Sequence, residues 1–147
     1  MLKNKIYFTI LFVLVPLAFF CQRAEDMAVA LQVSFEWNPP CTSLLKSPEI
    51  TIESVPEGTV QFYVGLTDLD LPSFDHGGGF IPYRSENVIP AGAVEGYQGP
   101  SPPYGVIHSY EIMVEALGPS KEVLGVGRAK KRFPPEGEEE KRWSPCG

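Results

Sequence analysis

The stretch TVQFYVGL (residues 59–66) is the clearest strand signal in the chain, and it sets the fold class. Its apolar residues alternate with residues that are mostly polar or small. Because successive side chains of a β-strand point to opposite faces, this alternation predicts a half-buried strand. The inward side chains are expected to be Val60, Phe62, Val64 and Leu66. The strand leads into TDLDLPSFDHGGG (67–79), which its acidic residues and glycines predict to be a loop.

Four other segments show strand patterns, and together they predict a fold made mainly of β-structure. They are LQVSFEW (31–37), EITIESV (49–55), VIHSYEIMVEAL (106–117) and KEVLGVGRAKKRF (121–133). In the third of these, His108 and Tyr110 open the face that we expect to be buried. Turn signals separate the segments, and no amphipathic helix or internal repeat stands out. We therefore expect a single antiparallel β-sandwich-like domain with few or no helices.

Composition and charge narrow the class of protein further. The chain has 147 residues, of which 44% are hydrophobic and 20% charged, as expected for one packed domain. Fifteen prolines and fourteen glycines favour many turns. The formal net charge is −6, and the main basic run is RAKKR (128–132). An acidic domain without a basic stripe argues against nucleic acid as a partner.

The N-terminus has the pattern of an export signal. Two lysines precede an apolar segment at 6–20 that is short for a membrane-spanning helix. Cys21 lies directly after this segment and could be the lipidated cysteine of a lipoprotein. Alternatively, AVA (28–30) fits ordinary signal cleavage, and both possibilities stay open. We expect a periplasmic or membrane-anchored lipoprotein that meets a membrane only through this anchor or a lipid. The expected organisation is a signal sequence (1–20), a linker (21–30), the β domain (31–135) and a charged tail (136–147).

The chain has three cysteines, and whether they can form a disulfide depends on the redox state of the compartment that contains the protein. If Cys21 is lipidated or removed, Cys41 and Cys146 remain as an even pair. They could form one disulfide after export. The alternative is that one or both stay free.

In FDHGGGFIPY (74–83) a histidine stands beside three glycines, which raises the question of whether this segment belongs to a catalytic or binding site. The glycines could form an oxyanion hole, cradle an anion or simply turn the chain. An α/β-hydrolase would also need a G-x-S-x-G elbow and alternating strands and helices, and the sequence shows neither. A metal site is a further option, although acid pairs at a strand end more often cap turns. Its ligands would come from Asp68, Asp70, Asp75, His76 and His108.

Two motif regions resemble the phosphatidylethanolamine-binding proteins, also called Raf kinase inhibitor-like proteins. They are TDLDLPS with DHGGG, followed by GYQGPSPPYGVIHSYEIMVEAL. The family pattern is D-P-D-A-P at a strand end, a histidine on the next segment, then G-x-x-P-P and H-R-Y opening another strand. The resemblance covers about residues 31–135 and is closest to the short exported bacterial members.

The resemblance implies a pocket for small anions, such as phosphate or a phosphoryl headgroup. The matching positions are Asp68, Asp70, Pro72, His76, Gly77, Gly78, Gly99, Pro102, Pro103, His108 and Tyr110. The sequence departs from the family pattern at Leu69 and Leu71, which replace a proline and an alanine, and at Ser109, which replaces an arginine.

These matches imply a binding protein without catalytic residues or a cofactor. The two histidines would donate hydrogen bonds to the anion together with glycine N–H groups, and the aspartates would fix the histidine tautomers. The alternative is a metal-dependent or histidine-dependent hydrolase of small phosphate or ester substrates. Nothing in the sequence names the natural ligand or a protein partner.

Overall fold

The computed structural model of the protein describes residues 28–137. The predicted signal sequence, Cys21, Cys146 and most of the predicted charged tail lie outside these residues. The lipidation of Cys21 and the pairing of Cys41 with Cys146 therefore stay predictions. Among residues 28–137, no helix is long and apolar enough to cross a membrane.

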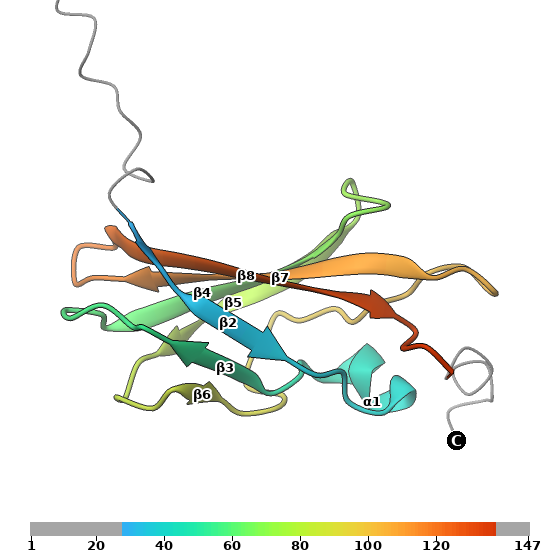
Figure 1. The fold of residues 1–147 in the computed structure, drawn as a ribbon, viewed down its shortest axis with the longest axis horizontal. Coiled ribbons are helices and arrows are strands. Elements are labelled where there is room, and N and C mark those ends of the chain that lie inside the picture. The colour runs from blue at the N-terminus through green and yellow to red at the C-terminus, as the bar shows by residue number, and fades with distance from the viewer. Residues whose placement is uncertain (1–27, 138–147) are drawn as a thin grey trace, which may run out of the picture.

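Within residues 28–137, two β-sheets pack face to face, and a single short helix lies at one end of them (Figure 1). The larger sheet has the order β1 (Val29–Ala30), β8 (Val123–Phe133), β7 (His108–Leu117), β4 (Gln61–Asp68) and β5 (Asp75–Pro82). The smaller sheet has the order β2 (Gln32–Phe35), β3 (Ile50–Glu53) and β6 (Val88–Ile89). Helix α1 spans Pro40–Leu45, inside a segment expected to be a loop. The architecture confirms the prediction of a mainly β, sandwich-like domain.

The predicted strand alternation places the core between the sheets. Along β4 and β7 every second side chain is buried, as expected for strands that pack on one face only. The buried apolar side chains include Phe62, Val64, Leu66, Tyr110, Ile112 and Val114 of the larger sheet and Phe35, Ile50 and Ile52 of the smaller sheet. Val60 was expected to point inward but is 44% exposed, because it lies just before β4 at the end of the sheet.

Strand β1 corrects one boundary of the predicted organisation. Val29 and Ala30, placed by sequence in a linker, pair with Gly125 and Val126 of β8. This pairing is parallel, whereas every other strand pairing in residues 28–137 is antiparallel. The ordered domain therefore begins before residue 31.

Strand β5 corrects the predicted loop at 67–79, because the three glycines form part of this strand. Gly78 and Gly79 pair with Gly65 and Val64 of β4. Glycine has no side chain and cannot show an alternation of apolar and polar residues, so this segment carries no strand signal.

A β-bulge lies at His76 and Gly77, next to the end of β4. Gly65 pairs with Gly78 and Thr67 with Asp75, so β5 carries one residue more than β4 over this interval. Gly77 has a φ of +70°, which favours glycine. The extra residue reverses the alternation: the side chains of Asp75 and Phe80 are exposed, and His76 between them is 2% exposed. The bulge therefore turns His76 into the protein.

Candidate functional site

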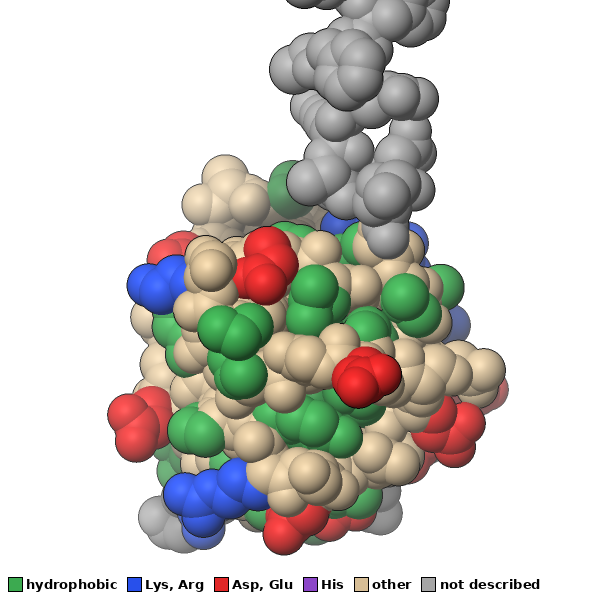
Figure 2. Space-filling view, turned by 90° about the vertical axis from the view of Figure 1, so that its left-hand side faces the viewer, with side chains coloured by type: hydrophobic (Ala, Val, Ile, Leu, Met, Phe, Trp, Pro, Cys, Tyr) green, Lys and Arg blue, Asp and Glu red, His purple; other side chains and the backbone are tan. Residues whose placement is uncertain are grey.

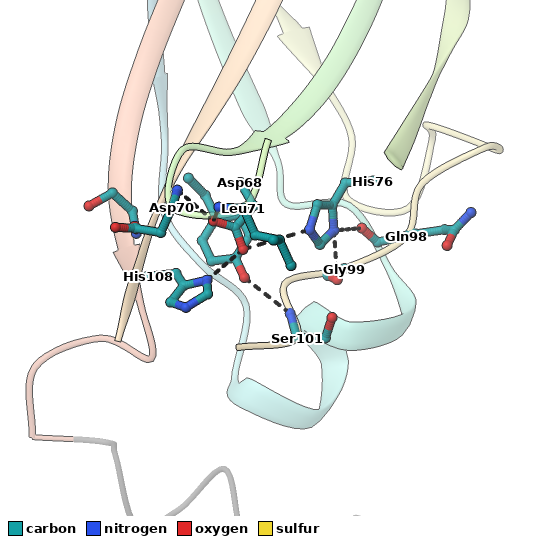
Figure 3. A network of polar contacts seen from close by, with 10 residues as sticks. Asp68, Asp70, Leu71, His76, Gln98, Gly99, Ser101 and His108 are labelled. Carbon is teal, nitrogen blue, oxygen red and sulfur yellow. Dashed lines mark hydrogen bonds and ion pairs between the residues drawn. The ribbon is translucent and has the colours of Figure 1, made fainter. Parts of the chain in front are cut away.

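The C-terminal end of β4 carries a buried carboxylate that organises the surrounding polar groups (Figure 3). Asp68 is 2% exposed. Its Oδ1 atom accepts hydrogen bonds from the backbone N–H groups of Asp70, at 2.9 Å, and Leu71, at 3.0 Å. These bonds hold the chain in a tight turn directly after the strand.

His108 begins β7 and is bonded to the same carboxylate. Its Nδ1 lies 2.6 Å from Asp68 Oδ2. A carboxylate only accepts hydrogen bonds, so Nδ1 carries the hydrogen and donates it. The pairing of β4 with β7 creates this contact, because it sets Asp68 opposite Tyr110, two residues beyond His108. The His108 side chain is 13% exposed, so its ring lies close to the surface.

His76 approaches Asp68 from β5, on the other side of β4. Its Nδ1 lies 2.9 Å from the carbonyl oxygen of Gln98 and 3.2 Å from that of Gly99. Both partners are carbonyls, so Nδ1 donates here as well. Its Nε2 lies 4.0 Å from Asp68 Oδ2. Asp68 thus stands between the two imidazoles, which arrive from different strands (Figure 3).

Aromatic rings surround the two histidines. Tyr110 is fully buried and meets the His76 ring edge-on, with ring centroids 5.3 Å apart. It stacks beside His108 at 6.3 Å, and its hydroxyl oxygen accepts a hydrogen bond from the Ser101 N–H at 3.3 Å. Phe74 covers His76 from the outside at 4.7 Å. These contacts fix the planes of the imidazole rings.

The Asp68 carboxyl is ionised at neutral pH. Burial raises its pKa, but hydrogen bonds from the side chains of His108 and Tyr110 and from the backbone of Asp70 and Leu71 together lower the pKa below its ordinary value of 3.8. The hydrogen-bond donors outweigh the burial because several of them converge on one carboxylate. The site therefore contains one buried negative charge between two imidazoles.

Asp70 lies closer to solvent than Asp68. Its Oδ2 accepts a hydrogen bond from the Ser109 backbone N–H at 2.6 Å. One ligand atom from each of Asp68, Asp70 and His108 lies within 4.8 Å of the others, which could suit a cation. Asp75, a further predicted metal ligand, is outside this cluster and accepts a bond from the Gly77 N–H at 2.8 Å.

The structure brings together six of the predicted site residues: Asp68, Asp70, His76, Gly99, His108 and Tyr110. Sequence reasoning did not find Gln98, nor that the carbonyl groups of Gln98 and Gly99 orient His76. A backbone carbonyl is common to every residue type, so no sequence signal could have revealed them.

The predicted glycines fit close backbone packing. A Cβ atom on Gly77 would lie 1.9 Å from the Gly96 carbonyl oxygen, and one on Gly78 would lie 2.4 Å from that of Val64. A Cβ atom on Gly99 would lie 2.2 Å from the Ser43 carbonyl oxygen, against α1. These contacts explain why glycine is needed at each position, whether or not a ligand also approaches. Of the predicted prolines, Pro102 is buried, whereas Pro72 and Pro103 are exposed.

Comparison with known proteins shows the class of fold. No family model and no curated protein matches the sequence. Among solved structures, YbcL of Escherichia coli, described as a member of the mammalian PEBP family, superposes with a TM-score of 0.56 and 19% identity. The match covers 71% of this chain and 98% of YbcL.

A second solved structure gives the same result. It is CT736 of Chlamydia trachomatis, described as a phosphatidylethanolamine-binding protein homologue, with a TM-score of 0.56 and 16% identity. The match covers 74% of this chain and all of that one. The protein therefore has the fold of the phosphatidylethanolamine-binding proteins, which confirms the predicted resemblance at the level of the fold.

Proposed function

We propose that the protein is an exported member of the phosphatidylethanolamine-binding family that binds a small anion or phosphoryl headgroup without catalysis. The observation that carries the proposal is the state of the two imidazoles. Each Nδ1 donates to a fixed acceptor, the carbonyls of Gln98 and Gly99 for His76 and the Asp68 carboxylate for His108. Within residues 28–137, neither Nε2 has a hydrogen-bond partner. The His108 ring lies close to the surface, where a ligand can reach its Nε2, whereas His76 is buried and its Nε2 lies 4.0 Å from Asp68 Oδ2, on the inner side of the site.

The fixed tautomers make anion binding depend on proton uptake. With Nδ1 already carrying a hydrogen, a neutral imidazole has only a lone pair at Nε2 and cannot donate there. Protonation adds the Nε2–H and a positive charge, and both attract an anion. Affinity for phosphate should therefore be higher with the imidazoles protonated than with the imidazoles neutral.

A binding role is favoured over catalysis by the neighbours of the histidines. In the part of the chain that the structure describes, no hydrogen bond joins either imidazole to a serine, threonine or cysteine side chain. A histidine-activated nucleophile would need such a contact. Asp68 acts instead as the partner that orients His108.

A metal-dependent hydrolase is the second candidate, and one observation favours it. The ligand atoms of Asp68, Asp70 and His108 are close enough together for one cation to contact all three. This reading predicts that phosphate binding or turnover requires a divalent metal and is abolished by a chelator.

Titration calorimetry with phosphate and phosphoethanolamine tests the proposal. The variants His76→Gln and His108→Gln cannot supply a charged donor, and each should bind about 10- to 150-fold more weakly, because a hydrogen bond to a charged group contributes roughly 1.5–3 kcal/mol. Arg84→Gln is the control, since it removes an exposed positive charge outside the polar network. Circular dichroism checks that each variant folds.

The same titrations separate the alternatives. Equal affinities in all four proteins would remove the histidines from the site and refute the proposal. Loss of binding in chelator, or hydrolysis of a phosphate ester that stops in the histidine variants, would favour the metal or enzyme reading. Fractionation of cells that express the full chain tests export, and recovery only in the cytoplasm would contradict it.

A further inference from the structure

Two loops beside the polar site carry an unusual share of the exposed apolar side chains. Ten large hydrophobic residues within 28–137 are strongly exposed, and five of them lie in these loops. They are Leu69, Leu71 and Phe74 in the 69–74 loop, and Tyr104 and Val106 in the 101–107 loop, with exposures of 39%, 48%, 45%, 78% and 41%. We call these five side chains the apolar rim.

The apolar rim flanks the site because its two loops lead into and out of the site strands. The 69–74 loop joins Asp68 to β5, and the 101–107 loop ends at His108. Leu71 is held by the hydrogen bond from its N–H to Asp68, and Phe74 lies against the His76 ring. Both loops lie at the same end of the molecule, where the 69–74 loop projects beyond the sheets (Figure 1).

Figure 2 views the opposite end of the molecule, where apolar side chains lie among acidic and basic ones. Apolar exposure that is concentrated at loop tips around one site points to an interaction surface, because single scattered apolar residues are ordinary on any protein.

The size of the apolar rim helps to identify its partner. Five large side chains of about 150–200 Å² each, roughly half exposed, present on the order of 400–500 Å². One side of a standard protein interface needs about 800 Å². The rim is therefore small for a protein partner or a second copy of this chain, whereas a lipid surface can accept a few side chains from projecting loops.

The charge of the loops indicates how a lipid surface would be recognised. Neither the 69–74 loop nor the 101–107 loop contains a lysine or arginine, and Asp70 is their only charged residue. Its carboxylate accepts a hydrogen bond from the Ser109 N–H. Attraction to anionic lipids needs clustered basic residues, which these loops lack. Contact would thus depend on apolar insertion.

We propose that the apolar rim inserts into the surface of a lipid bilayer and so places the polar site at the headgroup level. The rim depends on the exposure of five side chains and not on any ligand in the site. Anion binding and lipid insertion can therefore fail separately.

Tryptophan reporters in the full chain test this inference with vesicles of phosphatidylcholine. Phe74→Trp and Tyr104→Trp place a reporter on each loop, and Phe80→Trp is the matched control, because Phe80 is 59% exposed on the open face of β5. The wild-type chain gives the background emission of Trp37 and Trp143. The apolar 6–20 segment is present in every variant, so its own lipid binding cancels in the comparison.

Quenching by phosphatidylcholine brominated on its acyl chains should be at least about twofold stronger for both loop reporters than for the control, since only inserted side chains reach the acyl chains. The excess should persist at about 1 M salt, where electrostatic attraction is screened. Phosphate titrations of the reporter variants show separately whether the anion site is intact. Equal quenching at all three positions would overturn the inference. Reporters that respond to protein concentration instead of vesicles would overturn it in favour of a second copy.

Discussion

At the scale of single residues, Asp68 decides the character of the site. Its two oxygen atoms have different partners: Oδ1 accepts from the turn after β4, and Oδ2 accepts from His108. The side chain therefore couples the backbone geometry of a loop to the tautomer of an imidazole. Because the side chain is only 2% exposed, water cannot replace its charge, so removing that charge leaves several hydrogen-bond donors without a charged acceptor.

The lowered pKa of Asp68 gives a pH dependence with a definite sign. The folded protein favours the ionised carboxyl more than the unfolded chain does, because the folded pKa lies below the ordinary value of 3.8. The resulting stabilisation is fully present above about pH 4 and is lost as the pH falls through the lower folded-state pKa.

Asp68→Asn tests this linkage. At about pH 5 its free energy of unfolding should be roughly 1.5–3 kcal/mol below that of the wild type, and at about pH 2.5 the gap should narrow. Urea denaturation at the two pH values measures both gaps. Glu57→Gln, in an exposed turn, is the control and should leave the stability nearly unchanged at either pH. A gap for Asp68→Asn that is the same at both values would contradict the assignment.

At the scale of elements, the glycines of β5 allow close backbone packing that places His76 in the site. Its glycines let the chain pass close to the 94–98 segment, where the Gln98 N–H donates to the His76 carbonyl at 2.9 Å. The bulge at Gly77 turns His76 inward, although the simple alternation from Phe80 would point it outward. The three glycines thus position a histidine.

Gly77→Ala should disturb both stability and the site. The φ of +70° and the 1.9 Å approach to the Gly96 carbonyl each disfavour a Cβ atom, so we expect a loss of about 2–4 kcal/mol. Gly79→Ala is the matched control in the same strand, since its Cβ atom would meet only ordinary contacts at 3.7 Å or more, and it should cost about 1 kcal/mol or less. Urea denaturation of the two variants measures the difference. Similar losses would show that the bulge does not require glycine at position 77.

The strands differ in how far sequence could predict them. In β4 and β7 the alternation of apolar and polar residues was sufficient, because both strands pack on one face. In β5 the glycines and the bulge hide the alternation, and β6 has only two residues. The site residues Asp68, His76 and His108 were found through a resemblance of motifs. Their hydrogen-bonded geometry depends on strand register, which no local pattern contains.

At the scale of the whole molecule, Trp37 links the two sheets beside the site. It follows β2 of the smaller sheet, and its indole N–H donates to the Arg132 carbonyl of β8 at 2.8 Å. Its ring meets Tyr110 and Phe133 of the larger sheet edge-on, with centroids 6.0 and 5.3 Å apart. Tyr110 in turn contacts both histidines. The packing of the sheets and the geometry of the site therefore share the same residues.

Because the same residues hold the two sheets together and shape the site, we expect the sheets to unfold together and a bound anion to stabilise both. In a Trp143→Phe variant, Trp37 is the only tryptophan, so its fluorescence reports on the junction of the sheets while far-ultraviolet circular dichroism reports on all strands. The two urea transitions should coincide. Phosphate at about 100 times its dissociation constant should raise the free energy of unfolding by about 2.7 kcal/mol with both probes. The same phosphate concentration should stabilise the His76→Gln protein much less. Transitions that separate, or a phosphate effect on one probe alone, would show that the sheets and the site are independent units.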